Sequence, residues 1–319
     1  MEFYMAPLEG ITSYIYRRAY EHYFHNIDRY FTPFIVNPKL SAKEIRDLSP
    51  ENNPGMKVIP QIMTNKSDAF LQVSEEINSL GYDEVNLNLG CPSGTVVSKK
   101  RGAGFLSVPE KLDAFLAEIF GKSSVKISAK TRIGISDLEE WEPLLAIYKK
   151  YPFEELIIHP RLQKDFYKNT PHMEAYTKAY ETIKVPLCYN GDIDSVEKFL
   201  QFTKKYPQTN RMMFGRGILK YPNLVAEIKQ EPLADKETFQ QFHNEIYEGY
   251  CSIMSGDQNT LYKMKELWPY LGLSFTNPEK YMKKIKKTQH LAEYQIYVKE
   301  LFREQELVFN SYVNSNSFL

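Results

Sequence analysis

The chain has 319 residues, and its 40 Lys and Arg residues balance its 40 Asp and Glu residues. A net charge of zero argues neither for nor against a polyanionic partner, so any surface that binds nucleic acid must be local. Three cysteines, at positions 91, 188 and 251, are too few and too scattered for a disulfide framework or a CxxC metal site. The N-terminus lacks the pattern of a signal peptide, and no apolar stretch is long enough to span a membrane. These features predict a cytoplasmic protein without a bound metal or a membrane anchor.

Eight short apolar segments recur along the chain at the spacing of one strand–helix unit. They begin near Phe3, Arg29, Lys57, Glu84, Val125, Glu155, Pro186 and Arg211. Eight such units before position 232 predict an α/β fold of the (β/α)8 TIM-barrel type. A doubly wound sheet is the weaker alternative, because Pro7-Leu8-Glu9-Gly10 after the first strand is not a GxGxxG motif.

After Pro232 the pattern changes to long helical segments with no convincing strand. The segments expected to be helical are Phe239–Met254, Thr260–Leu271, Pro278–Lys287 and Leu291–Phe309. Four helices of this length predict a small C-terminal bundle. We therefore expect a barrel domain at 1–232, a helical domain at 237–310 and a frayed tail at 311–319.

The fourth predicted strand leads directly to a cysteine. Its apolar and polar residues alternate from Glu84 to Leu89, and Gly90-Cys91-Pro92 follows. The glycines that follow, Gly94, Gly102 and Gly104, predict a mobile loop, which is flanked by the basic segment Ser98–Arg101. Barrel enzymes collect their chemistry at the C-terminal ends of the strands, so this position predicts a reactive thiol. The alternative is a small buried hydrophobic residue, which is the commoner role of a free cysteine.

Other strand ends carry polar or glycine residues. Gly191 and Gly215-Arg216-Gly217 follow the seventh and eighth strands, where such barrels often bind a phosphate, and Arg216 would neutralise it. Gln61, Lys130 and His159 end three further strands, and together they suit the carbonyls and nitrogens of a flavin-like ring. Taken singly, each of these features has an alternative interpretation. The glycine motif also fits an ordinary turn, Lys130 also fits a lysine that forms a Schiff base, and His159 also fits a structural histidine.

Several motifs of the barrel appear together and in order. They are Ala6–Gly10, Gln61, Asn88–Pro92 with Gly102–Leu106, Lys130–Gly134, Asn190–Asp192 and Gly215–Gly217. With these motifs the chain resembles the dihydrouridine synthases, flavin enzymes that reduce specific uridines in tRNA. The resemblance covers the barrel almost from end to end and extends to a helical C-terminal domain. The Gly-Cys-Pro motif with its later Gly-Ala-Gly is the most specific part.

The resemblance implies FMN in the mouth of the barrel, NADPH or NADH as the reductant, and tRNA as the substrate. It implies no obligate protein partner. Carried over by position, the residues that contact FMN are Pro7, Leu8 and Glu9 from the first strand, Gln61, Lys130 and His159 at the ring and ribityl chain, and Asn190, Gly191, Asp192, Gly215 and Arg216 at the phosphate end.

The resemblance also assigns the residues that act on the uridine. Reduction of the C5=C6 bond requires a hydride at C6 and a proton at C5, and Cys91 would be the general acid. An ordinary thiol has a pKa of about 8.5, so it holds a proton at neutral pH. The residues expected to contact the substrate are Asn88 at the uracil, Arg132 and Arg161 at carbonyl or phosphate groups, and Lys99, Lys100 and Arg101 at RNA phosphates.

The sequence departs from the family at two places. Leu8 stands where methionine is common, a volume-conserving change that we expect to be neutral, and the second departure is a loop. It has His159-Pro160-Arg161-Leu162 where His-Gly-Arg-Thr is usual, which leaves the conformation of this loop open. Three other functions remain possible at this point: a flavin oxidoreductase of a free pyrimidine or small metabolite, a dihydrouridine synthase acting on rRNA, and a non-catalytic RNA-binding barrel. No local motif indicates which uridine is reduced, which nicotinamide nucleotide is used, or the oligomeric state.

Overall fold

The computed structural model describes residues 1–308, and the chain divides into two compact units. The first unit comprises 1–7, 28–192 and 203–214. The second comprises 8–27, 193–202 and the chain from 215 onward. The sheet lies in the first unit, and the C-terminal helices lie in the second.

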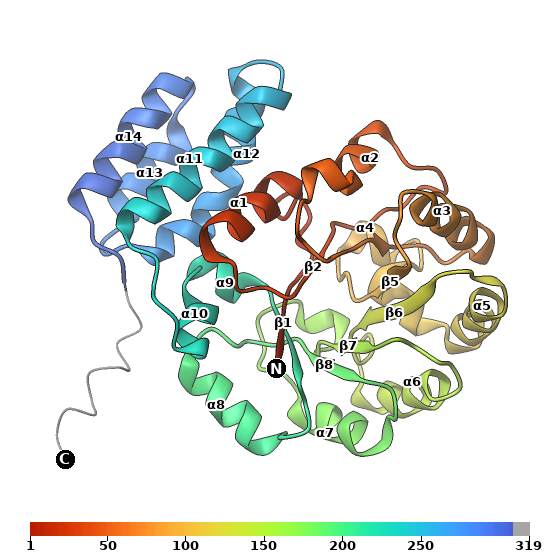
Figure 1. Cartoon of the computed structure of the whole chain (residues 1–319). Helices are drawn as coiled ribbons and strands as arrows, with labels where there is room; N and C mark the ends of the chain where they lie inside the picture. Colours follow the sequence, from red (N-terminus) through yellow and green to blue (C-terminus); the bar gives the residue numbers. More distant parts are fainter. Residues whose placement is uncertain (309–319) are drawn as a thin grey trace, which may run out of the picture. The chain divides into compact units, whose positions relative to one another are not determined.

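The first unit is built around one parallel sheet, whose strands run in the order β3-β2-β1-β9-β8-β7-β6-β5-β4 (Figure 1). The strands are β1 (Glu2–Met5), β2 (Arg29–Phe31), β3 (Val58–Ile59), β4 (Gln61–Ile62), β5 (Glu84–Leu89), β6 (Lys126–Thr131), β7 (Leu156–Ile158), β8 (Leu187–Tyr189) and β9 (Arg211–Phe214). Only Pro60 separates β3 from β4, because proline has no N–H to donate to a ladder. The two ends of the strand order therefore belong to one interrupted strand, which leaves eight strand positions. The predicted (β/α)8 barrel is confirmed, and each of the eight strand positions begins within one residue of its predicted start.

The helices of the first unit lie outside the strands (Figure 1). They are α2 (Ala42–Leu48), α3 (Ser67–Ser79), α4 (Gly94–Val97), α5 (Pro109–Lys122), α6 (Trp141–Tyr148) and α7 (Met173–Thr182). Helix α8 (Val196–Lys205) begins in the second unit and ends in the first. All six residues of β5 are buried, as expected for a strand that is covered on both faces.

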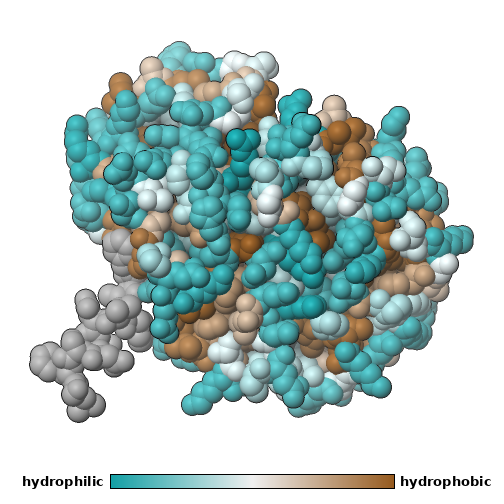
Figure 2. Space-filling view, in the orientation of Figure 1, coloured by the Kyte–Doolittle hydropathy of each residue, from teal (hydrophilic) through white to brown (hydrophobic). Residues whose placement is uncertain are grey.

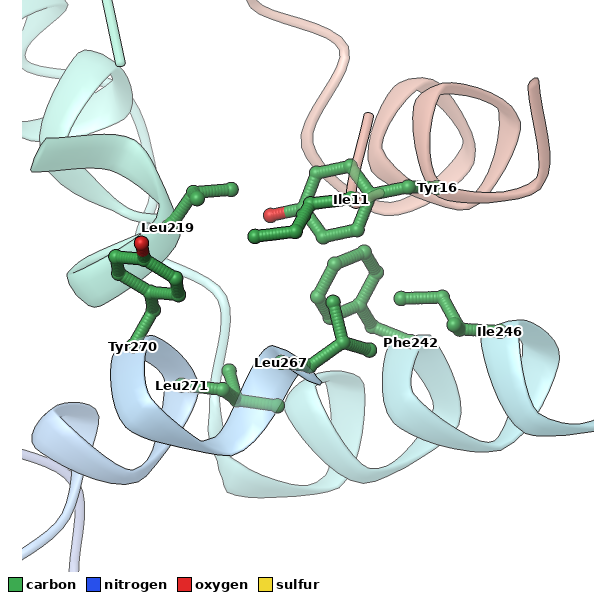
Figure 3. A pocket seen from close by; sticks show the side chains of 8 residues that line it. All are labelled: Ile11, Tyr16, Leu219, Phe242, Ile246, Leu267, Tyr270 and Leu271. Carbon is green, nitrogen blue, oxygen red and sulfur yellow. The ribbon is translucent and has the colours of Figure 1, made fainter. Parts of the chain in front are cut away.

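The second unit is helical. Its helices are α1 (Tyr14–Phe24), α9 (Arg216–Lys220), α10 (Leu224–Lys229), α11 (Lys236–Ile253), α12 (Asp257–Leu271), α13 (Glu279–Lys287) and α14 (Leu291–Glu304). An apolar pocket in this unit is lined by side chains from α1, α9, α11 and α12 and from the loop before α1 (Figure 3). Ile11 of that loop faces Leu267 and Leu271 of α12 across the pocket. The loop after β1 and the C-terminal helices thus share one apolar core.

Helix α14 is shorter than predicted. It ends at Glu304, whereas the apolar pattern predicted a helix to Phe309. The chain turns to extended structure because Leu307 forms an antiparallel bridge with Phe275, and the Val308 N–H donates to the Ser274 carbonyl at 2.8 Å. The apolar side chain that suggested a longer helix is buried by this bridge instead. The predicted tail at 311–319 lies outside the described residues.

Hydrophilic residues cover most of the face that Figure 2 shows, with hydrophobic residues between them. Among residues 1–308, no helix has both the length and the apolar character that a membrane crossing requires.

A buried ion cluster joins the N-terminal ends of several strands. The Arg29 guanidinium lies 3.0 Å from a carboxylate oxygen of Glu84 and 3.6 Å from one of Glu155. Arg211 lies 3.3 Å from the other oxygen of Glu155, and the Tyr4 hydroxyl donates to the same carboxylate at 3.2 Å. The Glu155 side chain has no exposed surface. This end of a barrel ordinarily serves stability, and the sequence patterns did not predict the cluster.

Arg29→Met is expected to lower the free energy of unfolding at pH 8 by about 3–5 kcal/mol, because it leaves two buried carboxylates short of a cation. Burial raises the pKa of Glu155 to about 7, although Arg29 and Arg211 oppose that shift. Below this pKa the folded protein holds Glu155 protonated. Arg29→Met should therefore lower the free energy of unfolding less at pH 5.5 than at pH 8. Urea unfolding, monitored by circular dichroism at both pH values, measures the change in unfolding free energy. Arg46→Met on the exposed face of α2 is the control, and an equal loss at both pH values would contradict the role of Glu155.

Candidate active site

A chain of polar side chains lies inside the barrel across β4, β5 and β6. The strand register pairs Gln61 with Asn86, Asn86 with Ser128, and Asn88 with Lys130. Gln61 donates to Asn86 at 2.8 Å and accepts from Asn88 at 2.7 Å, while Asn86 donates to Ser128 at 3.0 Å. These side chains occupy alternate positions of neighbouring strands, so they share one face. Gln61 is fully buried, and its bonds to Asn86 and Asn88 were not predicted from the sequence.

Asn88 holds the turn that presents Cys91. Its Oδ1 accepts hydrogen bonds from the backbone N–H groups of Gly90 and Cys91, both at 3.0 Å. Its Nδ2 donates to Gln61. The position of the Cys91 backbone is therefore coupled to the buried amide network, and Cys91 itself is half-buried at the end of β5. The sequence predicted Asn88 at the substrate, and the structure adds this positioning role.

The glycines after Cys91 are required by close packing. A Cβ on Gly102, whose φ is +52°, would lie 3.0 Å from the Cβ of Cys91 and 2.9 Å from the Val96 side chain. A Cβ on Gly104 would lie 2.6 Å from the Val97 carbonyl oxygen. The Ala103 N–H also donates to the Cys91 carbonyl at 3.1 Å. The 3-10 turn Gly102–Ser107 and helix α4 thus pack against the half-buried cysteine.

Gly104→Ala should destabilise the protein by about 1–3 kcal/mol, because the new methyl group meets backbone atoms that have no room to move. Gly94→Ala in the same loop is the matched control, since a Cβ there meets nothing within 4 Å. Thermal unfolding of both variants, compared with the parent, measures the difference. Equal melting temperatures for the two variants would show that the loop tolerates a side chain at position 104.

Lys130 is a partly exposed residue whose ammonium group lies deep in the protein. Its pKa is lowered to about 8, chiefly by burial and also by the nearby Arg132, while the thiols of Cys188 and Cys91 act in the opposite direction. Within residues 1–308, no hydrogen bond from its Nζ is found. A buried cation of this kind is poised for an electron-rich or anionic ligand. Cys188 is fully buried, and the sequence did not predict that it would approach Lys130.

Arg132 and Arg161 are both almost completely buried and bond to the loop after β7. Arg132 donates to the carbonyls of Gly90 at 2.9 Å, Leu162 at 2.8 Å and Phe166 at 2.7 Å. Arg161 donates to the Asn169 carbonyl at 2.7 Å and forms an ion pair with Asp192. Their direct contact with substrate stays a prediction, whereas their bonds to the loop are a feature that the sequence did not indicate.

His159 lies beside the Arg161–Asp192 pair. Its Nε2 is 2.9 Å from an Arg161 nitrogen, which is always a donor, so Nε2 is the acceptor of a neutral imidazole. Its ring stacks on Tyr167 with the centroids 6.1 Å apart. Pro160, which replaces the usual glycine, fits this loop because its carbonyl accepts from the His172 N–H at 2.7 Å and no donor is needed from its nitrogen.

The remaining predicted residues of the first unit lie at strand ends. Asn190 donates to the Met213 carbonyl at 2.9 Å, and Gly191 packs so closely on Tyr189 that a Cβ would meet its hydroxyl. Pro7 follows β1 and is half-buried. In the basic loop, Lys99 and Lys100 are exposed and Arg101 is half-buried. Lys100 donates to Ser107 at 3.1 Å.

Four predicted cofactor residues belong to the second unit: Leu8, Glu9, Gly215 and Arg216. The Leu8 N–H donates to Thr12 at 2.8 Å, and Lys263 of α12 donates to the Gly10 carbonyl at 3.3 Å. Glu9 is exposed, while Gly215 precedes α9 as its N-cap. The C-terminal helix α12 therefore holds the segment that carries Leu8 and Glu9.

The chain is similar to a known protein family along almost its whole length. The chain matches the family model described as dihydrouridine synthase over residues 4–313. A probable tRNA-dihydrouridine synthase of Staphylococcus epidermidis is 27% identical over 230 residues, which are 69% of each chain. The probable tRNA-dihydrouridine synthase 1 of a Synechocystis species is 23% identical over 282 residues, which cover 82% of this chain and 77% of that one.

Solved structures agree on the fold. Histamine dehydrogenase from a Rhizobium species superimposes with a TM-score of 0.51 at 10% identity, over 76% of this chain and 49% of that chain. A variant of NCR from Zymomonas mobilis gives a TM-score of 0.50 at 13% identity, over 73% of this chain and 88% of that one. At such low identity these structures support the barrel alone. The family model spans nearly the whole chain, and we conclude that the chain belongs to the dihydrouridine synthase family.

Proposed function

We propose that this protein is an FMN-dependent tRNA-dihydrouridine synthase, which reduces the C5=C6 bond of specific uridines with NADPH or NADH as the reductant. The observation that carries the proposal is the Cys91 turn, which Asn88 holds at the end of β5 beside the buried Lys130. Relatives that match across more than two thirds of their length bear the name tRNA-dihydrouridine synthase.

The residues inside the barrel fit a flavin. Lys130 provides a buried cation. Asn88 donates one amide N–H to Gln61, and Gln61 donates one to Asn86, so each keeps a second amide N–H. Lys130, Gln61 and His159 would contact the ring and ribityl chain, and Asn190, Gly191 and Asp192 the phosphate end. Pro7, Leu8, Glu9, Gly215 and Arg216 are proposed as further FMN contacts on the same family pattern. When bound and reduced, FMN supplies the hydride that adds to uracil C6.

Cys91 supplies the proton. As the hydride reaches C6, negative charge develops at C5 and O4 of the uracil, and the thiol proton moves to C5. The resulting thiolate takes a proton from solvent, so the net reaction consumes one NAD(P)H and one proton per uridine. Asn88 fixes the cysteine backbone, which holds the thiol at a constant distance from the base.

RNA contacts are proposed at two places. Lys99, Lys100 and Arg101 lie on the loop that follows Cys91 and would meet phosphates near the target. In the second unit, Lys283, Lys286 and Lys287 of α13 are exposed, whereas Lys284 pairs with Glu300 at 2.9 Å. We assign the helical domain, 237–310, to RNA binding on this basis. A uridine in folded RNA would have to leave its stack to reach the barrel mouth.

The test begins with an absorbance spectrum of the purified protein. The protein is then incubated with NADPH and unmodified tRNA, and dihydrouridine is scored by mass spectrometry of the nucleosides. A flavin spectrum with dihydrouridine in tRNA supports the proposal. Product in rRNA only, or reduction of free uracil only, would redirect it to those substrates, and a colourless protein that FMN cannot reconstitute would overturn it.

A further inference from the structure

The loop after β7, residues 160–172, presents two adjacent aromatic side chains to solvent. Phe166 is 44% exposed and Tyr167 is 49% exposed. Large aromatic residues are usually buried, because leaving them in water forfeits much of their transfer free energy. Two exposed aromatic residues in succession therefore need an explanation.

The backbone at Phe166 is strained. Its φ of +48° and ψ of −99° lie outside the regions that a bulky residue adopts readily. Strain of this kind costs on the order of 1–3 kcal/mol and persists only where the surroundings enforce it. Here the enforcing contact is Arg132, which donates to the Phe166 carbonyl at 2.7 Å.

Buried polar groups hold the rest of the loop. Asp165 accepts hydrogen bonds from the Leu162 N–H at 2.9 Å, from Asn169 at 2.7 Å and from His172 at 3.0 Å. Burial opposes ionisation of Asp165, but these donors prevail and lower its pKa. One buried carboxylate thus holds the loop at three points around the two exposed aromatic residues.

The loop after β7 is joined to the segment that carries Cys91. Gln163 donates from its side chain to the Pro92 carbonyl at 2.9 Å, and Arg132 bonds both to Gly90 and to the loop. The Arg132 guanidinium also lies 5.3 Å from the centre of the Tyr167 ring. Two exposed lysines, Lys164 and Lys168, flank the aromatic pair.

We propose that Phe166 and Tyr167 form a stacking platform for an unpaired RNA base next to the target uridine. Aromatic rings beside basic residues suit single-stranded nucleotides, since the rings stack on the base faces and the lysines meet the phosphates. The bonds to Gly90 and Pro92 keep the platform at a constant distance from Cys91. This inference rests on the proposed reduction of uridine in RNA and adds the site that orders the extruded strand.

The test compares Phe166→Ala and Tyr167→Ala with the conservative variants Phe166→Tyr and Tyr167→Phe. Each alanine variant should weaken the binding of unmodified tRNA about 5- to 100-fold, and each conservative variant should keep the affinity of the parent. Fluorescence anisotropy of labelled tRNA, at several salt concentrations, measures the affinity. The alanine variants should leave the salt slope unchanged, whereas Lys164→Ala and Lys168→Ala should each reduce it by roughly the contribution of one phosphate.

FMN content and FMN affinity of every variant are measured alongside. Both should equal those of the parent in the Phe166 and lysine variants, whereas Tyr167 also stacks on His159, a proposed FMN contact. Leu200→Ala on α8 removes a side chain of similar exposure outside the loop and serves as the control. Alanine variants that bind tRNA as the parent does, or that lose FMN and not tRNA, would overturn the platform while the proposed function stands. A parent protein that reduces no RNA at all would overturn both.

Discussion

Cys91→Ala is expected to lower the rate of dihydrouridine formation by about 100- to 10,000-fold, the usual contribution of a positioned general acid. Its backbone hydrogen bond to Asn88 does not involve the thiol, so the turn should survive the change. Reduction of the bound flavin by NADPH should keep its parent rate, because that step needs no proton from Cys91. Stopped-flow absorbance measures flavin reduction, and single-turnover mixing of the reduced enzyme with tRNA measures uridine reduction.

Two variants serve as controls for this experiment. Cys251→Ala removes an exposed thiol on α11 and should have no effect on either step. Cys91→Ser keeps a hydroxyl, a much weaker acid than a thiol, and should remain slow. A Cys91→Ala protein that reduces uridine at nearly the parent rate would show that another group supplies the proton.

Lys130→Met should have two opposite effects, one on cofactor binding and one on stability. FMN affinity should fall at least about tenfold, because the variant loses the buried cation that the flavin would contact. The FMN-free protein should instead become more stable at pH 7 by about 1–3 kcal/mol, since one unit of pKa shift corresponds to about 1.4 kcal/mol. Fluorescence titration with FMN measures the first effect, and urea unfolding measures the second.

The stability effect has a defined pH dependence. Burial lowers the pKa of Lys130 from 10.5 to about 8, so between these values the unfolded chain binds more protons than the folded protein. The parent should therefore gain stability from this group as pH rises from about 8 to 10.5, and Lys130→Met should lack that gain. Lys126→Met, at the exposed start of the same strand, is the control and should show neither effect. A variant with parent FMN affinity would remove Lys130 from the cofactor site.

The positions of the strands were predictable because a strand in this fold is a local pattern. Alternation from Glu84 to Leu89, followed by Gly90, indicates both the strand and its end without knowledge of any partner. The motif glycines were visible in the sequence, but they predicted a mobile loop, whereas Gly102 and Gly104 are positions where close packing leaves a Cβ no room. Helix ends depended on distant contacts, which is why α14 stops at Glu304 rather than Phe309.

The amino-acid sequence by itself thus determined the order of strands and helices, the family, and the candidate residues at the strand ends, because each of these is encoded in neighbouring residues. Only the tertiary structure decided which side chains interact. Asn88 bonds to the Cys91 backbone, Arg132 and Arg161 hold the loop after β7, and Arg29 meets Glu155 from 126 positions away in the chain. Hydrogen bonds and ion pairs between distant residues depend on strand register and burial, and no local pattern records them.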